Sequence, residues 1–251
     1  RTRPYLSIVI PAYNEEKRLP PSLHTTLDYM STCDYTWDIV IVDDGSSDAT
    51  SALAAEILRG VDHTILRNDP NQGKARSVRR GLLESRGEVA LFTDSDLSTP
   101  IDEAEKLLGA IADGADVAIA SRQVRGSVIE IHQPWYREFA GRAFGTVNRL
   151  LLGHGIQDTQ CGFKAFRRAA IEAISPYQQV FGWAFDAEMM LIARRLRLRI
   201  EQLPVRWIDA PGTKVNMLVD GPKMVMDLLR IRWLHRSLRP VPGAGPCGGG
   251  R

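Results

Sequence analysis

The sequence predicts an α/β fold, a single domain in which a mainly parallel β-sheet is covered by helices. Short β-rich runs alternate with helix-like segments of ten or more residues, which is the pattern of repeated βαβ units. The run Ile39-Val40-Ile41-Val42 is continuously apolar, as expected of a strand buried on both faces. A length of 251 residues, with 44% hydrophobic and 25% charged side chains, suffices for one full core.

Five strands are predicted in the first half of the chain. They cover Leu6–Ile10, Trp37–Val42, Thr64–Leu66, Val89–Thr93 and Asp116–Ala120. Helix starts between these strands are indicated by capping residues and by a proline in the first turn. The expected helices are Ala49–Leu58 after Ser46 to Asp48, Lys74–Ser85 after Gly73, and one that begins at Ser98-Thr99-Pro100 and runs through Ile111.

Beyond Ser121 the alternation changes. The elements expected there are a polar, basic connection, a helix near Phe139–Leu152, a short extended segment Phe163–Phe166, a segment Arg168–Ile174, a helix Asp186–Leu196 and a strand Arg199–Trp207. Residues 216–239 are predicted to form an amphipathic basic helix, which either packs on the domain or lies at a membrane surface. The Gly- and Pro-rich residues 240–251 are predicted to be disordered. The α/β domain itself is expected to span residues 1–215.

Composition excludes several classes of protein. The net charge of +2 gives no argument for a nucleic-acid partner. The three cysteines, Cys33, Cys161 and Cys247, are far apart and lack C-x-x-C spacing, so neither a disulfide framework nor a zinc site is indicated. No stretch reaches the roughly 18 apolar residues of a membrane span. We therefore expect a soluble or peripheral protein, in the cytoplasm or at the cytoplasmic face of a membrane.

Positive charge is concentrated in two segments. Residues 122–149 hold five arginines against Glu130 and Glu138, and residues 222–239 hold five Lys or Arg against Asp227 alone. Each segment is either a solvated helix face or a surface for an anionic partner.

Asp94, Ser95 and Asp96 directly follow the predicted buried strand Val89–Thr93. By motif alone, such a spaced pair of aspartates more often caps a helix or faces solvent. The setting favours a metal, because Mg²⁺ prefers one or two carboxylates together with phosphate oxygens and water, and ligands collect at the carboxyl edge of an open α/β sheet. A metal on Asp94 and Asp96 that bridges a pyrophosphate would also stabilise a diphosphate as a leaving group.

Polar residues follow two other predicted strands at the same kind of position. After the first strand come Pro11 and Ala12, then Tyr13, whose ring can stack on a base, and Glu15, whose oxygens can accept hydrogen bonds; a plain turn explains these residues equally well. Asp43 follows the second strand within Asp-Asp-Gly-Ser-Ser-Asp, which is either a turn with a helix cap or an acceptor for a base edge.

Gly73 and Lys74 follow the third strand. Gly73 lets the backbone approach a ligand closely, and Lys74 at a helix N-terminus can meet a phosphate. No G-x-G-x-x-G follows a predicted strand and no G-x-x-x-x-G-K-[ST] is present, so neither a dinucleotide enzyme nor a P-loop NTPase is indicated.

Seven segments together resemble a known family. Four of them, in this order and spacing, resemble the inverting glycosyltransferase family 2, whose members have the Rossmann-like GT-A fold: PAYNE (Pro11 to Glu15), DDGSSD (Asp43 to Asp48), GKA (Gly73 to Ala75) and TDSDLSTP (Thr93 to Pro100). Three later segments resemble its polyprenyl-phosphate branch, and are most similar to dolichyl-phosphate β-glucosyltransferases: DTQCGFKAFRR (Asp158 to Arg168), GWAFDAEMM (Gly182 to Met190) and PGTK (Pro211 to Lys214). The similarity extends from about Leu6 to about Arg236.

This resemblance implies roles for individual residues. Asp94 and Asp96 would bind Mg²⁺ or Mn²⁺ and the nucleotide diphosphate. Arg122 and Arg137 align with arginines that face the diphosphate and the lipid phosphate in related mannosyl enzymes. The substrate-binding residues would be Pro11, Ala12, Tyr13, Glu15, Asp43, Gly73, Lys74, Ser95 and Lys214.

Two positions depart from the pattern of those mannosyl enzymes. Ser98 stands where they commonly carry a metal-contacting Gln, and Gly141 stands where a phosphate-contacting Ser is expected. The acceptor phosphate would therefore depend on other donors.

The implied reaction is the transfer of a hexose, expected to be glucose from UDP-glucose, to a polyprenyl or dolichyl phosphate at a membrane surface. The second pKa of a phosphate monoester is about 6, so the acceptor is largely dianionic at neutral pH and needs no general base. Arginine suits such an acceptor, because its guanidinium binds phosphate in bidentate fashion and stays charged. The two basic segments would meet the membrane.

Other possibilities remain open in the sequence. A sugar-hydroxyl acceptor would require a carboxylate base, for which Asp186 and Glu188 are candidates, although Asp186 is equally a candidate N-cap. Asp158 is either catalytic or orients the adjacent loop Gln160 to Lys164. No residue distinguishes UDP-glucose from GDP-mannose. A non-catalytic nucleotide-sugar-binding module at a membrane is the second class of hypothesis.

Overall fold

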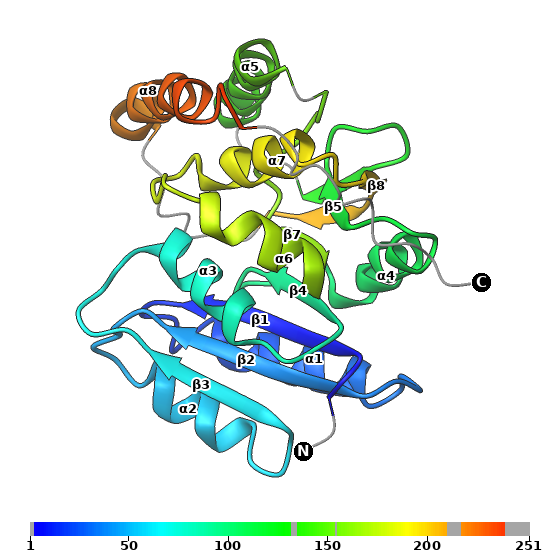
Figure 1. Ribbon diagram of the computed structural model, residues 1–251. Helices are drawn as coiled ribbons and strands as arrows, with labels where there is room; N and C mark the ends of the chain where they lie inside the picture. Colours follow the sequence, from blue (N-terminus) through cyan, green and yellow to red (C-terminus); the bar gives the residue numbers. More distant parts are fainter. Residues whose placement is uncertain (1–2, 132–134, 154, 210–216, 239–251) are drawn as a thin grey trace.

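A seven-stranded sheet lies at the centre of the computed structural model, which describes residues 3–131, 135–153, 155–209 and 217–238 (Figure 1). The strand order is β3-β2-β1-β4-β7-β5-β8, and only β7 is antiparallel to its neighbours. The strands are β1 (Leu6–Ala12), β2 (Trp37–Asp43), β3 (His63–Arg67), β4 (Val89–Thr93), β5 (Val117–Ser121), β7 (Phe163–Arg167) and β8 (Ile200–Pro204). The predicted mainly parallel sheet is confirmed.

The first strand extends further than the sequence predicts. Pro11 does not end β1, because the strand runs on to Ala12 with Pro11 opposite Val42 of β2. On the other side of β1, the pairing with β4 already stops at Val9. Pro11 lacks an N–H, and it therefore sits where only one neighbouring strand is still paired, as expected of proline in a sheet.

Helices cover both faces of the sheet. They are α1 (Leu19–Met30), α2 (Thr50–Ile57), α3 (Lys74–Glu84), α4 (Ala104–Ala112), α6 (Arg168–Ile174) and α7 (Phe185–Arg195), with short 3-10 helices η1 (Ile101–Glu103) before α4 and η2 (Ser175–Tyr177) after α6. Side chains alternate along each strand. Ile8 and Ile10 of β1 therefore pack in the cluster that contains residues of α1, α2 and α4, whereas Val9 packs with residues of α3, α6 and α7.

The predicted strand Arg199–Trp207 is two strands. β8 ends at Pro204, and after the buried Val205 the chain forms β9 (Arg206–Ile208), which pairs with β6 (Val128–Ile131) in a separate two-stranded sheet. Pro204 lies on an edge strand and has no N–H with which to extend the ladder, so the strand breaks there.

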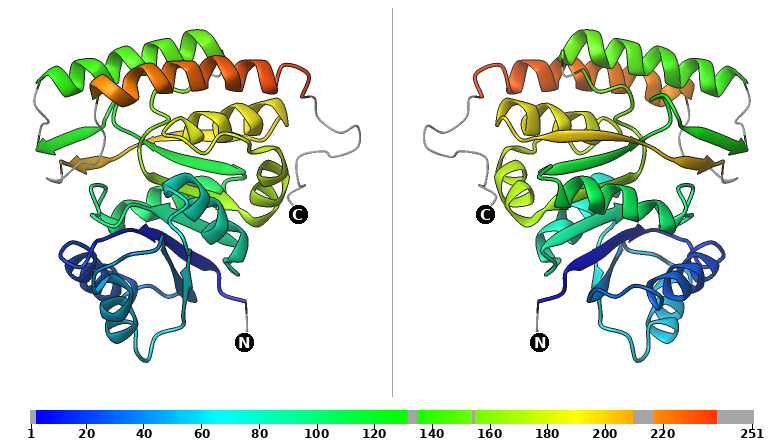
Figure 2. Two further views of the ribbon diagram at one scale, coloured as in Figure 1. Left: turned by 90° about the vertical axis from the view of Figure 1, so that its left-hand side faces the viewer. Right: turned by 90° about the vertical axis from the view of Figure 1, so that its right-hand side faces the viewer.

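Two long helices form a further layer beyond α7. α5 (Trp135–Leu152) and α8 (Met217–Leu234) lie side by side there (Figure 2). Leu228 and Ile231 of α8 are completely buried in a cluster with Leu152 of α5 and Ala187 of α7. One face of the predicted amphipathic helix thus packs on the domain. The expected boundary at residues 215 and 216 and the expected tail 240–251 lie outside the described residues.

Candidate active site

The acidic pair lies at the carboxyl edge of the sheet, directly after β4. The side chains of Asp94 and Asp96 are 31% and 23% exposed, so a ligand can reach both. Asp96 Oδ1 accepts hydrogen bonds from the Ser98 N–H (3.1 Å) and the Ser98 hydroxyl (3.0 Å). Ser98 therefore fixes the Asp96 carboxylate. Among the described residues, no cluster of three or more His, Cys, Asp or Glu side chains could hold a metal by itself.

Two cations flank this pair. Lys74, the first residue of α3, places its Nζ 2.6 Å from Asp94 Oδ1. Burial alone would lower the pKa of Lys74, but the carboxylates of Asp94, Asp186 and Asp96 together raise it, so the ammonium stays charged. On the other side, Arg18 Nη1 lies 4.0 Å from Asp96 Oδ2. The sequence predicts the position of Lys74 but gives no signal for Arg18.

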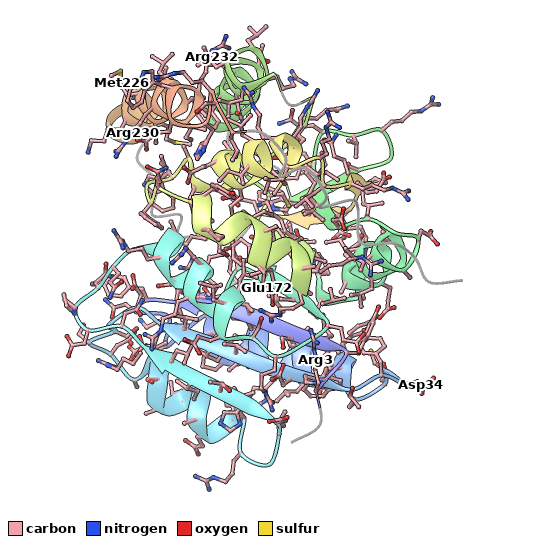
Figure 3. The ribbon with its side chains drawn as sticks, viewed as in Figure 1. Arg3, Asp34, Glu172, Met226, Arg230 and Arg232 are labelled. Carbon is pink, nitrogen blue, oxygen red and sulfur yellow. The ribbon has the colours of Figure 1, made fainter. Side chains whose placement is uncertain are left out.

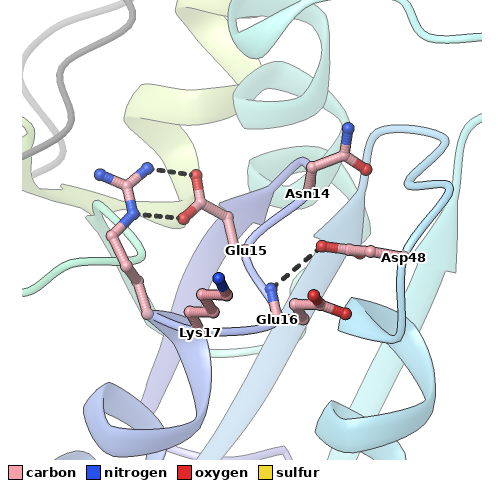
Figure 4. Close-up of a pocket in the computed structure, with 6 residues that line it drawn as sticks. Asn14, Glu15, Glu16, Lys17 and Asp48 are labelled. Atoms are coloured by element: carbon pink, nitrogen blue, oxygen red, sulfur yellow. Dashed lines mark hydrogen bonds and ion pairs between the residues drawn. The ribbon is translucent and has the colours of Figure 1, made fainter.

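Arg18 is held by Glu15 at a pocket of about 280 Å³ (Figure 4). Its Nε and Nη2 each donate to a different oxygen of the Glu15 carboxylate at 2.6 Å. Glu15 is buried and its backbone N–H donates to the Thr50 hydroxyl. The predicted acceptor thus already binds a guanidinium within the protein. Tyr13, two residues earlier, is 40% exposed, so its ring remains accessible for stacking.

Asp43 and its neighbour Asp44 stabilise, through hydrogen bonds, the loop after β2 and the loop between β3 and α3. Asp43 is buried at the end of β2, where it accepts hydrogen bonds from Arg67 Nη1 (2.6 Å) and from the Ser46 N–H (2.8 Å). The Asp44 carboxylate accepts from the backbone N–H groups of Gln72 (3.0 Å) and Gly73 (2.7 Å). Gly73 has a φ of 89°, a conformation that favours glycine, and directly precedes Lys74. Asp44 thereby positions the loop that presents Lys74.

The predicted cap role of Ser46 to Asp48 is only partly correct. The N-cap of α2 is Ala49, which has no side chain able to cap, although Asp48 Oδ1 does accept a hydrogen bond from the Thr50 N–H at 3.0 Å.

Arg122 follows β5 at the same edge of the sheet, where Asp158 holds it in a bidentate pair. Arg122 Nε and Nη2 donate to the two oxygens of Asp158 at 2.7 and 2.9 Å, and the Arg122 backbone N–H adds a third bond at 3.1 Å. Burial would raise the pKa of Asp158, but Arg122 outweighs it and the pKa is lowered. The charged Asp158 carboxylate therefore orients the Arg122 guanidinium.

Asp186 is not an N-cap, because α7 begins at Phe185 and its N-cap is Ala184. The Asp186 carboxylate instead pairs with the completely buried ammonium of Lys164 on β7, at 2.5 Å. Burial raises the pKa of Asp186, although Lys164 and Lys74 oppose that change. Lys164 also donates to the Cys161 carbonyl at 2.6 Å. The sequence gives no indication that Lys164 is buried.

Glu188, the other candidate base, is fully buried and serves a structural purpose. Its carboxylate accepts hydrogen bonds from the backbone N–H groups of Gln179 and Val180, and lies 2.8 Å from His235 Nε2 just beyond α8. It thus joins α7 to the end of α8.

The remaining predicted site residues are placed as follows. Pro11 and Ala12 end β1, Ser95 lies buried between the two aspartates, and Arg137 lies within α5. Lys214 lies outside the described residues. The buried Nε2 of Gln160 has no hydrogen-bond partner among the described residues, and the sequence did not single it out.

Comparison with solved structures supports the fold. The crystal structure of glucosyl-3-phosphoglycerate synthase from Mycobacterium tuberculosis in complex with Mn²⁺, UDP and glucosyl-3-phosphoglycerate aligns with a TM-score of 0.69 at 19% identity, covering 96% of this chain and 83% of that one.

Comparison of sequences identifies the family. Dolichyl-phosphate beta-glucosyltransferases of Trichomonas vaginalis, Saccharomyces cerevisiae and Homo sapiens are 39%, 36% and 33% identical to this chain over 242, 250 and 253 residues. These alignments cover 92%, 92% and 95% of this chain and 74%, 75% and 76% of the relatives. A model described as glycosyl transferase family 2 matches residues 7–175. The chain therefore belongs to glycosyltransferase family 2.

Proposed function

We propose that this protein transfers glucose from UDP-glucose to dolichyl phosphate or a related polyprenyl phosphate. The observation that carries the proposal is the acidic pair Asp94 and Asp96 between the cations Lys74 and Arg18, at the sheet edge of a family 2 chain. The named relatives support the choice of glucose and of a dolichyl phosphate acceptor.

The donor nucleotide would lie along the carboxyl ends of β1 and β2. Tyr13 would stack on the base, and the backbone at Gly73 would approach the nucleotide closely. Glu15 and Asp43 already bind Arg18 and Arg67, so in this site they act through the guanidinium groups that they orient. Those guanidinium groups bring positive charge to the side of the site where a diphosphate is expected.

The donor set at Asp94 and Asp96 fits Mg²⁺ or Mn²⁺. Both ions favour carboxylate oxygens, and a site with two protein carboxylates leaves positions for phosphate oxygens and water. Each carboxylate is partly exposed, as a shared site with a ligand requires. A bound ion would supply charge neutralisation for the departing diphosphate, worth several kcal/mol. Lys74, which contacts Asp94 in the structure described here, would add its own charge to the same phosphates.

The acceptor phosphate needs no base in this account. An oxygen of the phosphate dianion forms a bond to the anomeric carbon, and the bond from that carbon to the nucleoside diphosphate breaks with its electron pair leaving on the diphosphate. Asp158 and Asp186 are both engaged, with Arg122 and Lys164 respectively. Arg122, and Arg137 on α5, are proposed to orient phosphate oxygens, because arginine binds them in a planar, bidentate manner.

The exposed face of α8 is proposed to meet an anionic membrane surface. Met226, Leu229 and Trp233 recur at helical spacing and are 65%, 45% and 62% exposed, on the side opposite the buried Leu228 and Ile231. The basic residues around this apolar stripe are Lys223, Arg230, Arg232 and Arg236, and Figure 3 shows Met226 and Arg230 projecting from α8.

An apolar stripe with basic margins is typical of a helix that lies in a membrane interface. No helix among the described residues is both long and apolar enough to span a bilayer. We propose that the protein acts at the cytoplasmic face of a membrane, or in the cytoplasm, because its widely spaced cysteines are typical of a reducing compartment.

A transfer assay tests the proposed function. The protein is incubated with Mn²⁺, a short-chain polyprenyl phosphate and either UDP-glucose or GDP-mannose, and lipid-linked sugar is measured. Glucosyl lipid from UDP-glucose is the expected product. Product formed with GDP-mannose but not with UDP-glucose would show that GDP-mannose is the donor instead. Binding of UDP-glucose without product, with every acceptor supplied, would identify a non-catalytic binding module instead.

A further inference from the structure

We infer that Gly162 is a positioning residue that holds the Asp94 carboxylate in place, and that this requires the absence of a side chain at position 162. The inference rests on the proposed role of Asp94 as a metal ligand. None of the residue roles predicted from the sequence concerns Gly162.

The sheet register places the two residues face to face. β4 and β7 are antiparallel, with Phe92 opposite Lys164 and Thr93 opposite Phe163. The next pair in this register is Asp94 and Gly162. Directly opposed residues of an antiparallel pair have their Cβ atoms about 4.5–5.5 Å apart. Their side chains therefore share one small space on the same face of the sheet.

The Asp94 carboxylate occupies the position that a side chain at residue 162 would take. A Cβ atom built on Gly162 would lie 2.1 Å from Asp94 Oδ2, 2.5 Å from Asp94 Cγ and 2.9 Å from Asp94 Oδ1. All three distances are shorter than a non-bonded contact permits. Any side chain at position 162 therefore has to displace the carboxylate or the backbone.

The backbone around Gly162 is the part that resists displacement. The Gln160 N–H donates to Asp158 Oδ1 at 3.1 Å, the Cys161 carbonyl accepts from the buried Lys164 ammonium at 2.6 Å, and the Cys161 thiol lies 3.7 Å from the Thr99 hydroxyl. Because its preceding residues are tied at three points, Gly162 stays in place and the Asp94 carboxylate moves instead.

Displacement of that carboxylate breaks the arrangement on its other side. Asp94 Oδ1 contacts Lys74 Nζ at 2.6 Å, so the carboxylate lies between the ammonium and the Gly162 backbone. Gly162 thus fixes where Asp94 presents its oxygens to a cation and to the diphosphate that accompanies it. Positioning of this kind is decisive in catalysis, because a shift of about 1 Å can cost about 100-fold in rate.

The experiment compares Gly162→Ala with Gly109→Ala as the matched control. Gly109 lies within α4, and a Cβ atom added there would meet no heavy atom within 4 Å. Mn²⁺ binding is measured by electron paramagnetic resonance in the presence of UDP, and transfer from UDP-glucose is measured in parallel. Gly162→Ala is expected to weaken Mn²⁺ binding about 10- to 100-fold, the usual effect of disturbing a group that orients a metal ligand. Gly109→Ala should match the unchanged protein.

A double-mutant cycle with Asp94→Ala separates positioning from folding. If Gly162→Ala acts only by displacing the Asp94 carboxylate, it should have no further effect once Asp94→Ala has removed that carboxylate. The double variant should then have the same Mn²⁺ affinity and the same thermal unfolding temperature as Asp94→Ala alone. Unchanged Mn²⁺ binding in Gly162→Ala overturns the inference. So does unfolding of both Gly162→Ala and the double variant, because the glycine would then be required by the backbone itself. Absence of Mn²⁺ binding by the unchanged protein would instead contradict the proposed metal site.

Discussion

The Lys74 ammonium lies 2.6 Å from Asp94 Oδ1 and thus joins the start of α3 to the end of β4. Both ammonium groups of this region, that of Lys74 and that of Lys164, also lie 5.6 Å from the centre of the Phe92 ring. Charges alternate from the partly exposed Asp94 through Lys74 to the buried pair of Asp186 and Lys164. The exposed end of this series of charges faces the proposed ligand, and the buried end supports it.

Replacing Lys74 by Met should impair donor use. A hydrogen bond to a charged group contributes about 1.5–3 kcal/mol, so kcat/KM for UDP-glucose should fall about 10- to 150-fold. Steady-state kinetics measure this. Lys106→Met is the control, because the Lys106 side chain is 48% exposed and pairs with Glu103, away from Asp94 and Asp96. Equal losses in the two variants would show that Lys74 has no particular role in the site.

Lys164→Met should destabilise the fold. It leaves the Asp186 carboxylate buried without its partner, which typically costs about 3–5 kcal/mol of unfolding free energy. Lys106→Met should cost about 1 kcal/mol or less, because the Lys106 side chain is 48% exposed and Glu103 keeps a second partner in Arg206. Urea unfolding measures both. The double variant Lys164→Met/Asp186→Leu should recover part of the lost unfolding free energy. If its loss instead equals the sum of the losses of the two single variants, the pairing is contradicted.

Asp158→Asn should change how stability depends on pH. The folded pKa of Asp158 lies below its ordinary value of 3.8, so the unfolded state takes up its proton first as pH falls. The stability that Asp158 supplies, about 1.5–3 kcal/mol, is therefore fully present above about pH 5 and is lost below that. The difference in unfolding free energy between the two proteins should therefore shrink as the pH is lowered from about 5 to about 3. A constant difference across this range would contradict the lowered pKa.

Trp233→Ala should weaken binding to vesicles that contain anionic lipid, because Trp233 is 62% exposed in the apolar stripe of α8. Arg230→Ala should weaken it about fivefold, since each basic residue near such a surface contributes about 1 kcal/mol. Flotation at low and high salt measures both effects. Leu83→Ala is the control, because Leu83 is also exposed, at 40%, but belongs to α3 and not to α8. Failure of the unchanged protein to float at low salt would exclude the membrane proposal.

Much of the fold could be predicted because it depends on local patterns. The apolar run in β2, the glycine before α3 and the aspartates after β4 each signal their element within a few residues. Pro204 is a local signal for the break that follows it, but the apolar pattern continues past the proline and hides the change of partner from β5 to β6.

The site was predictable where a motif ends or follows a strand, as for Asp43 and Asp94, or begins a helix, as for Lys74. It was not predictable where a contact joins distant segments. Arg18, Lys164 and Gly162 are brought to the site by the sheet order and by the insertion of the antiparallel β7, and neither leaves a pattern in the neighbouring sequence.

The central claim is that Asp94 and Asp96 hold a divalent metal that transfer requires. The most direct test measures the transfer of glucose from UDP-glucose to polyprenyl phosphate by the variants Asp94→Asn, Asp96→Asn and Asp34→Asn. Each is assayed with Mn²⁺ and again with a chelator. Asp34 is an exposed aspartate that precedes β2, at the opposite edge of the sheet (Figure 3). The account predicts that either site variant, or the chelator, lowers the rate by at least about 100-fold, because several kcal/mol of charge stabilisation are lost, while Asp34→Asn leaves it unchanged. Full transfer by Asp94→Asn, or by the unchanged protein in chelator, would contradict it.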